Sequence, residues 1–312
     1  MLYRARAYFF WIKIINIWIN KNGVFMYKII KKEKLTEDID RFYIKAPLIA
    51  EKAKPGQFVV IRVNEEGERI PLTIADYDRK NGIISIVSMR VGKTTTLLSG
   101  LKQGDSIQDV VGPLGNASEI KNFGKVICIG GGVGIAPVFP ITRELKRAGN
   151  YIISIIGARS KDLLILNKEM KNVSDELYIC SDDGSTGYHG FVSGFLKEYL
   201  DKDLSGKKDR ETSIARVVAI GPAQMMAAVA EVTRPLSIKT IVSLNSIMVD
   251  GTGMCGACRV EVDGKTKFVC VDGPEFDAHQ VNFNLLLSRQ KIYCDDEGVC
   301  FDLYKHKCKL PQ

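Results

Sequence analysis

Short apolar runs rich in β-branched residues follow one another between residues 27 and 111. They read YKIIKKEKL, RFYIKA, QFVVIRV, GIISIVSMRV and DSIQDVV, and the turn pairs Pro55-Gly56, Asn81-Gly82 and Gly104-Asp105 stand between them. Regularly spaced short strands with turn residues between them are typical of an antiparallel barrel. We therefore predict an antiparallel β-barrel over residues 26–118.

The pattern changes after Gly115-Asn116, where buried-strand runs begin to alternate with helical ones. The strand runs are KVICIG (125–130), YIISIIGA (151–158), LYICS (177–181) and RVVAIG (216–221). A helical stretch reaches about Ala148, and GFLKEYL and AQMMAAVAEVTR also have helical patterns. Strands that alternate with helices predict a parallel, doubly wound α/β sheet, here over residues 119–235.

Beyond residue 236 the chain becomes rich in glycine and cysteine, which predicts a small third domain over residues 236–285 and a C-terminal tail over 286–312. The length of 312 residues agrees with two or three domains at roughly 100–200 residues each. A composition of 46% hydrophobic and 26% charged residues excludes collagen-like and wholly disordered proteins.

The net charge of +8 is concentrated at the N-terminus. Residues 1–34 hold eight Lys or Arg against the single acid Glu33, so +7 of the charge lies there. A basic face is therefore not indicated for the remainder, and we expect no nucleic-acid partner.

The apolar run AYFFWIKIINIWI (7–19) is shorter than the roughly 20 apolar residues of a spanning helix, and no A-x-A-like cleavage site follows it. We favour an incidental extension over residues 1–25, with Met26 as the start. An interfacial amphipathic segment and a targeting signal stay open. A membrane partner is not expected.

Asp250, Cys255, Cys258 and Cys270 have the spacing of a plant-type [2Fe–2S] site, with Asp in the first position. A carboxylate can bind ferric iron, and the glycines between these residues suit a loop that wraps a cluster. The alternatives are a zinc site of three Cys and one Asp, or ordinary core cysteines. Cysteines crowded in this way favour a metal site in a reducing compartment over disulfides, so we expect a cytoplasmic protein.

A glycine cluster, Gly130 to Gly134, follows a predicted strand and precedes a predicted helix. That context suits a pyrophosphate at a helix N-terminus, although Ile135 stands where G-x-G-x-x-G requires its third glycine. Tight packing and phosphate binding are equally compatible with such a turn. Further turns at 181–185 and at Gly221-Pro222 also follow strands, and three turns at the carboxyl ends of parallel strands would line one crevice.

A third signal combines Arg69-Ile70-Pro71-Leu72-Thr73 with Gly92-Lys93-Thr94-Thr95. An Arg near a strand, with a hydroxyl two residues past a Pro, could hold a diphosphate and a polar ring edge, but on this signal alone a solvated Arg is the better explanation of Arg69. A P-loop is excluded, because Val87 occupies the position of its first glycine.

In this order, these motifs resemble the ferredoxin reductase superfamily over about residues 26–285. Two branches are most similar: the electron-transfer subunit of NAD-dependent dihydroorotate dehydrogenase, and the small (alpha) subunit of NADH-dependent ferredoxin:NADP oxidoreductase, or sulfide dehydrogenase. The resemblance implies an FAD-binding barrel, an NAD(P)-binding α/β domain and a C-terminal [2Fe–2S] domain.

The resemblance also implies a role for each motif. Arg69 is expected at the FAD phosphates and Thr73 near the isoalloxazine ring. The other flavin positions are Pro71, Leu72, Gly92, Lys93, Thr94 and Thr95. The nucleotide positions are Gly132, Gly134, Pro137, Asp183, Gly184, Ser185, Gly221, Pro222 and Met225. The metal positions are Asp250, Cys255, Cys258 and Cys270. Relatives often have Cys where this chain has Ile220.

The function implied is electron transfer from NAD(H) through FAD and the cluster to a larger flavin or iron–sulfur subunit, and through that subunit to ferredoxin. NADP(H) stays open as the nucleotide. Asp250, within VDGTGMCGAC, favours the ferredoxin:NADP oxidoreductase branch over a dihydroorotate dehydrogenase subunit. A non-catalytic zinc-binding interaction module is the alternative of another class. Cys294, Cys300, Cys308 and His279 fit no ligand spacing and are expected to be bystanders.

Overall fold

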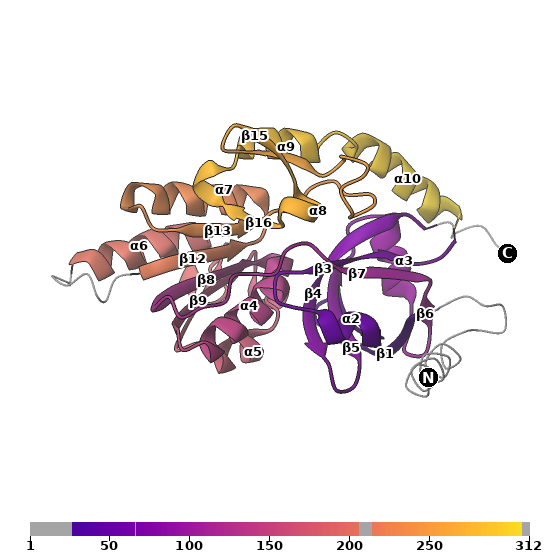
Figure 1. Cartoon of the computed structure of the whole chain (residues 1–312), viewed down its shortest axis with the longest axis horizontal. Coiled ribbons are helices and arrows are strands. Elements are labelled where there is room, and N and C mark those ends of the chain that lie inside the picture. The colour runs from indigo at the N-terminus through magenta and orange to yellow at the C-terminus, as the bar shows by residue number, and fades with distance from the viewer. Residues whose placement is uncertain (1–26, 66, 206–213, 308–312) are drawn as a thin grey trace, which may run out of the picture.

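The computed structural model describes residues 27–65, 67–205 and 214–307. The N-terminal extension predicted for residues 1–25 and Cys308 lie outside the described residues. A barrel, an α/β unit and a C-terminal segment lying across both make up the described chain (Figure 1).

The barrel is a seven-stranded antiparallel sheet in the order β6-β1-β2-β5-β4-β3-β7. Its strands are β1 (Tyr27–Lys34), β2 (Ile39–Lys45), β3 (Phe58–Arg62), β4 (Arg69–Asp78), β5 (Ile83–Met89), β6 (Ser106–Ile107) and β7 (Asp109–Leu114). Only Gln108 separates the edge strands β6 and β7, so the two edges of the sheet meet. The predicted antiparallel barrel is confirmed.

Three elements of the barrel were not predicted. Helices α2 (Pro47–Lys52) and α3 (Lys93–Gly100) connect strands, and β4 pairs with both β3 and β5. The sequence of β4, RIPLTIADYD, contains a proline and three charged residues, so it lacks the apolar alternation by which its neighbours are recognised.

The α/β unit contains a second seven-stranded sheet in the order β11-β10-β9-β8-β12-β13-β16. Its strands are β8 (Lys125–Gly131), β9 (Tyr151–Ala158), β10 (Glu176–Ser181), β11 (Tyr188–His189), β12 (Ile214–Ile220), β13 (Thr240–Ser243) and β16 (Glu275–Asp277). All neighbours are parallel except β13 and β16. Helices α4 (Ile135–Arg147) and α5 (Asn167–Asn172) cover one face, and α6 (Val192–Ser205) and α7 (Ala223–Thr233) cover the other (Figure 1).

This arrangement confirms the predicted doubly wound sheet. From β8 the chain builds outward through β9 and β10, then returns to place β12 on the other side of β8. The carboxyl ends of β8 and β12 therefore form the switch point, where open α/β sheets bind their ligands.

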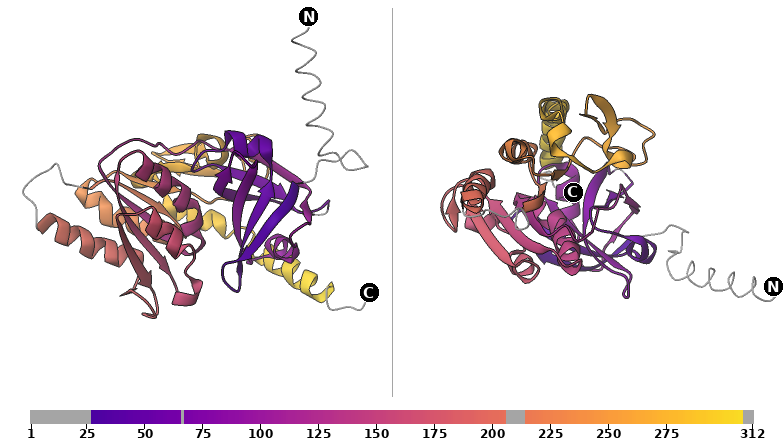
Figure 2. Two further views of the ribbon diagram at one scale, coloured as in Figure 1. Left: turned by 90° about the horizontal axis from the view of Figure 1, so that it is seen from below. Right: turned by 60° about the vertical axis from the view of Figure 1, so that its left-hand side comes forward.

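The C-terminal segment contains the hairpin β14 (Arg259–Val262) and β15 (Lys265–Phe268), followed by α8 (Val269–Asp272), β16, α9 (Phe283–Gln290) and α10 (Cys294–Lys307). Single 3-10 turns lie at Gly132–Gly134, Lys161–Leu163, Arg234–Leu236 and Ala278–Gln280. The stretch predicted as a tail thus contains α10, which runs back along the barrel to α3 (Figure 2).

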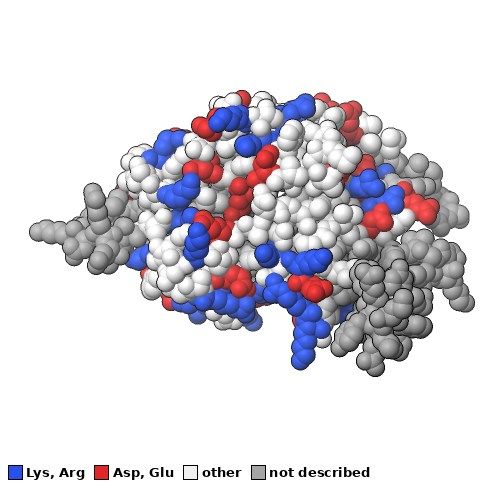
Figure 3. All heavy atoms as spheres, in the orientation of Figure 1, with Lys and Arg blue, Asp and Glu red and all other residues white. Residues whose placement is uncertain are grey.

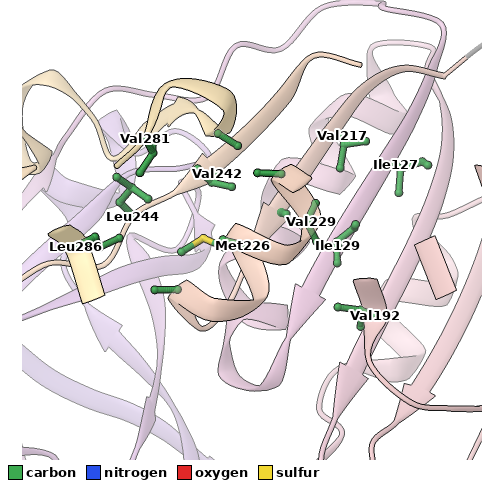
Figure 4. Packing of buried hydrophobic residues seen from close by; sticks show 14 of the residues in the cluster. Ile127, Ile129, Val192, Val217, Met226, Val229, Val242, Leu244, Val281 and Leu286 are labelled. Carbon is green, nitrogen blue, oxygen red and sulfur yellow. The ribbon is translucent and has the colours of Figure 1, made fainter. Parts of the chain in front are cut away.

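The C-terminal segment shares its core with the α/β unit. Val281 and Leu286 pack in the same buried cluster as Met226 and Val229 of α7 (Figure 4). The cluster extends across the sheet to Ile127 of β8. The cluster also contains Cys258 and Cys270. The segment is therefore fixed to the sheet by apolar packing.

Lys and Arg alternate with Asp and Glu over the face shown in Figure 3. Among the residues that the structure describes, no helix is long and apolar enough to cross a membrane.

The shared core predicts a large cost for truncating Ile127, which is fully buried. Ile127→Ala is expected to lower the free energy of unfolding by about 2–5 kcal/mol, because a cavity is left in a packed sheet. The control is Val111→Ala, whose side chain is 46% exposed and whose truncation is expected to cost about 0.5 kcal/mol or less. Urea denaturation measures both, and equal losses would contradict the packing described.

Candidate functional site

A cavity of about 880 Å³ opens at the switch point, where the barrel faces the carboxyl ends of β8 and β12. All three parts of the chain contribute to its wall. Ten residues expected at the site line it: Pro71, Leu72, Thr73, Thr95, Gly132, Gly134, Pro137, Gly221, Pro222 and Met225. The structure thus brings together motifs that lie more than 150 residues apart in the sequence.

Two glycine turns touch at the base of this cavity. A Cβ on Gly134 would lie 2.3 Å from the carbonyl oxygen of Ile220 and 2.7 Å from the Cα of Gly221. A Cβ on Gly131 would lie 2.3 Å from the Sδ of Met225. Because the atoms that Gly134 meets belong to the backbone and cannot move aside, glycine is required for packing at that position, whereas the Met225 side chain beside Gly131 can rotate.

Gly132 has a different role from its neighbours. Its φ is +55°, and a Cβ built on it meets no atom within 4 Å, although the residue lines the cavity. The turn therefore offers open backbone on its cavity side, in front of the first turn of α4. The turn is therefore tightly packed at Gly134, where it meets β12, and open at Gly132, where a phosphate has room. Both interpretations of the glycine cluster thus apply, each to a different side of the turn.

On the barrel side, β4 presents alternate residues to the cavity. Pro71, Thr73 and Ala75 line it together with Leu72, while Ile74 is buried in the barrel interior. Arg69, at the start of the same strand, is exposed and does not line the cavity.

The segment Gly92 to Thr95 forms the N-terminus of α3. The hydroxyl of Thr95 accepts hydrogen bonds from the N–H groups of Val91 and Gly92, at 3.0 and 3.1 Å. Thr94 is buried and its hydroxyl lies 3.2 Å from Glu68. Of the four residues, only Thr95 lines the cavity, and Gly92, Lys93 and Thr94 stand behind it.

The turn after β10 reaches the cavity wall through one residue, Asp182. Asp183 accepts hydrogen bonds from the N–H and hydroxyl of Ser185, at 2.9 and 2.6 Å, and these bonds lower the pKa of Asp183. Asp183, Gly184 and Ser185 are exposed and do not line the cavity, whereas Asp182 does. Asp182 is the first acid past the end of a parallel strand, a signal that the topology rule could have used.

The C-terminal segment brings two thiols together. The sulfurs of Cys258 and Cys270 lie 3.2 Å apart and both side chains are buried. Burial raises the pKa of the Cys270 thiol. Two thiolates this close would repel each other, so a bound cation is the condition under which both can ionise.

The other two residues of the predicted set lie on the loop before Cys258. Cys255 is exposed, and the carboxylate of Asp250 accepts hydrogen bonds from the N–H groups of Thr252 and Cys255, at 2.7 and 2.8 Å. Hydrogen bonds from these backbone groups lower the pKa of Asp250. Within the described ranges, no three His, Cys, Asp or Glu side chains converge on one metal position. Three thiols and a carboxylate, from the loop before β14 and from α8, still make a donor set chemically suited to iron.

The loop from Asp250 to Cys258, called the cluster loop below, packs directly on the barrel. A Cβ on Gly251 would lie 2.8 Å from side-chain carbons of Val60 and Leu114. Val269, the neighbour of Cys270, lines the cavity. The thiol pair is therefore next to the cavity wall, a placement that depends on tertiary packing and that no local pattern predicts.

The expected bystanders contribute no ligand cluster in the described chain. Cys294 and Cys300 are exposed on α10. The Nε2 of His279 lies 2.9 Å from the hydroxyl of Thr233.

Comparison with known proteins agrees with this architecture. Residues 26–118 match the oxidoreductase FAD-binding domain, and residues 245–282 match the iron–sulfur cluster binding domain of dihydroorotate dehydrogenase B. A Thermotoga maritima protein, described as a homologue of the electron transfer subunit of dihydroorotate dehydrogenase B (NAD(+)), is 48% identical over 282 residues, covering 90% of this chain and 96% of its own. The electron transfer subunit from Fusobacterium nucleatum is 29% identical over 256 residues, covering 80% and 94%.

Solved structures also match this chain over most of its length. A chain of NADH-dependent reduced ferredoxin-NADP oxidoreductase, described in relation to flavin-based electron bifurcation, is 48% identical with a TM-score of 0.82, over 90% of this chain and 99% of its own. Phthalate dioxygenase reductase, 17% identical with a TM-score of 0.56 over 82% and 96% of the two chains, shares the fold.

The fold and the matched domains define a flavin-dependent oxidoreductase that carries an iron–sulfur domain. The chain belongs to the family of dihydroorotate dehydrogenase B electron transfer subunits and their homologues. The predicted resemblance and the expected FAD and iron–sulfur cofactors are confirmed at this level.

The contact between the two glycine turns can be tested by adding one methyl group. Gly134→Ala is expected to cost about 1–3 kcal/mol of stability, because the new Cβ meets backbone atoms that cannot rotate away. Gly100→Ala is the matched control, since its Cβ meets no atom within 4 Å. Thermal unfolding measures both, and a Gly134→Ala protein as stable as Gly100→Ala would show that the turns do not touch.

Proposed function

We propose that this chain is the electron-transfer flavoprotein subunit of a heteromeric oxidoreductase, passing electrons between NAD(H), FAD and a [2Fe–2S] cluster. The observation that carries the proposal is one cavity with walls from the flavin-motif strand β4, from both glycine turns and from Val269 beside the thiol pair. An electron carrier needs its cofactor sites side by side, and this cavity would bring all three together.

The barrel side of the cavity would hold FAD. Thr73 and Leu72 of β4 would contact the ring system, and the N-terminus of α3, with Thr95, would receive the pyrophosphate. Arg69, Gly92, Lys93 and Thr94 lie on the same two elements and would complete the phosphate site from outside the cavity wall. When bound, FAD exchanges two electrons with a nicotinamide nucleotide and single electrons with an iron–sulfur cluster.

The α/β side would hold the nucleotide. The open face of Gly132 would accept the pyrophosphate, and Gly221, Pro222 and Met225 would contact the nicotinamide end. Asp183, Gly184 and Ser185 would border the adenosine end, where Asp182 lines the wall. A carboxylate there would accept a hydrogen bond from a ribose 2′-hydroxyl and repel a 2′-phosphate, which favours NADH over NADPH.

Cys255, Cys258, Cys270 and Asp250 would hold the cluster. The backbone N–H groups that now bind Asp250 also hold the loop in the shape that presents Cys255. A reducing compartment, the cytoplasm, is where such thiols stay available for iron.

The partner would dock over the cluster loop. Met254 is 89% exposed. Val249 on the same loop and Val271, which packs at Gly253, are also exposed. Apolar side chains exposed together are typical of an interface core. The partner expected is a larger flavin or iron–sulfur subunit, with ferredoxin reached through it. The 48% identity to a chain of NADH-dependent reduced ferredoxin-NADP oxidoreductase supports that complex, and the name of the Thermotoga maritima relative supports a dihydroorotate dehydrogenase as the second candidate.

The visible absorption spectrum of anaerobically purified protein tests the proposal. Flavin bands with iron–sulfur shoulders are expected, and NADH should bleach both at lower concentration than NADPH. Dithionite is the control, since it should bleach both whatever the nucleotide preference. A colourless protein that contains zinc and no acid-labile sulfide would overturn the proposal in favour of a zinc-binding module.

The role of Asp250 is tested by changing the donor atom. Asp250→Cys is expected to retain a cluster at wild-type iron and sulfide content but to shift its reduction potential, because thiolate is a softer donor than carboxylate. Asp263→Asn, which removes an exposed carboxylate from the turn between β14 and β15, is the control and should leave the potential unchanged. Overlapping redox titrations of wild type and Asp250→Cys would show that Asp250 is not a ligand.

A further inference from the structure

Two arginines from different parts of the chain meet at one carboxylate between the barrel and the α/β unit. Asp76 on β4 accepts a hydrogen bond from the Nη1 of Arg143 on α4 at 2.7 Å. The Nη2 of Arg41 on β2 lies 3.6 Å from the other oxygen of Asp76. The side chains of Arg41 and Arg143 are only 7% and 17% exposed, so water and salt screen this network less than a surface ion pair.

An irregularity in β4 places Asp76 in this network. Ile74 pairs with Ile86 and points into the barrel core, so strict alternation would also turn the side chain of residue 76 inward. The register shifts between Ile74 and Asp76, and Asp76 pairs with Ser85. The shift turns the carboxylate outward, to the face where the hydroxyl of Ser85 receives a 2.8 Å hydrogen bond from Arg41. A bulge that redirects one side chain is common next to functional sites.

The network joins the two elements that form opposite walls of the cavity. Thr73, three residues before Asp76, lines the barrel wall. Arg143 belongs to the helix that begins directly after Gly134, which lines the α/β wall. Ala75 packs in the same buried cluster as Val138 of α4, so the charged contact has an apolar contact beside it.

Other charged groups also surround the network. Glu169 of α5 lies 3.8 Å from Arg41, and Glu144 lies 3.2 Å from the Nε of Arg143. These acids hold the two guanidinium groups from the α/β side, whereas Asp76 is the carboxylate that approaches from the barrel. Removing it would leave two largely buried cations facing each other across the boundary.

We infer that Asp76, held by Arg143 and Arg41, is a positioning residue that sets the spacing between the flavin wall and the nucleotide wall of the cavity. The inference rests on the proposed function, because spacing matters when a nucleotide and a flavin must react across the cavity. Transfer between bound reactants is sensitive to displacements of about 1 Å, which can cost roughly 100-fold in rate. Asp76 touches neither reactant and acts through α4.

The test compares variants of the full-length holoprotein. Arg143→Met and Asp76→Asn are expected to retain wild-type flavin and iron content. Their flavin bleaching by saturating NADH is expected to be about tenfold slower or more, with less than about a twofold change in the NADH concentration for half-maximal rate. Arg147→Met is the matched control on the same helix, because Arg147 is 66% exposed and bonds to Glu144. Arg143→Lys, which retains the charge, is expected to recover most of the rate.

A second readout does not depend on turnover. Hydrogen–deuterium exchange without nucleotide is expected to rise in residues 130–137 of Arg143→Met and to stay at wild-type levels in Arg147→Met. Wild-type bleaching by NADH with unchanged rates in Arg143→Met and Asp76→Asn would overturn this inference alone, even if both variants melt earlier. A wild-type flavin that neither NADH nor NADPH bleaches would overturn the proposed function as well. If Asp76→Asn does not fold, Arg143→Met and Arg143→Lys still decide the outcome.

Discussion

The backbone contact between the two glycine turns is the constraint on which the site depends. Gly134 can approach the carbonyl of Ile220 only because it has no side chain, and the same contact brings α4 against the end of β12. Parallel strands β8 and β12 are neighbours in the sheet, so their following turns leave the same edge. The helices that follow these turns, α4 and α7, lie on opposite faces of the sheet. The two turns therefore diverge and leave a crevice between them.

The barrel closes this crevice from the opposite side. Its outer face contributes apolar residues to the α/β unit, with Ile39, Ala75 and Val87 in the same buried cluster as residues of α4. Such packing is non-directional, and the charged network around Asp76 adds direction to it. The cavity accordingly lies at the boundary between the two sheets, and the position of one sheet relative to the other determines its width.

The C-terminal segment depends on both sheets. Strand β16 extends the α/β sheet, and Glu275 at its start accepts a hydrogen bond from Ser118 in the connection from the barrel. Burial raises the pKa of Glu275. With Gly251 seated on Val60 and Leu114, the thiol pair is held by contacts to the barrel as well as to the sheet. Because the C-terminal segment has no core of its own and contacts both sheets, it is not free to move away from the barrel.

Local pattern was enough to predict much of this protein. The run 151–158 matches β9 residue for residue, and the glycine turns, the Asp250 to Cys270 spacing and the class of fold all follow from short-range signals. Such signals arise from alternation, turn chemistry and ligand spacing, which act between residues close in sequence. Strand β4 and helix α10 lack a clear local pattern and were missed. Only the tertiary structure decided that Asp182 lines the cavity in place of Asp183, that Cys258 meets Cys270, and that Asp76 meets Arg143 across 67 residues. These contacts depend on strand order, on one register shift and on how two sheets pack, and no local pattern encodes the distance between two sheets.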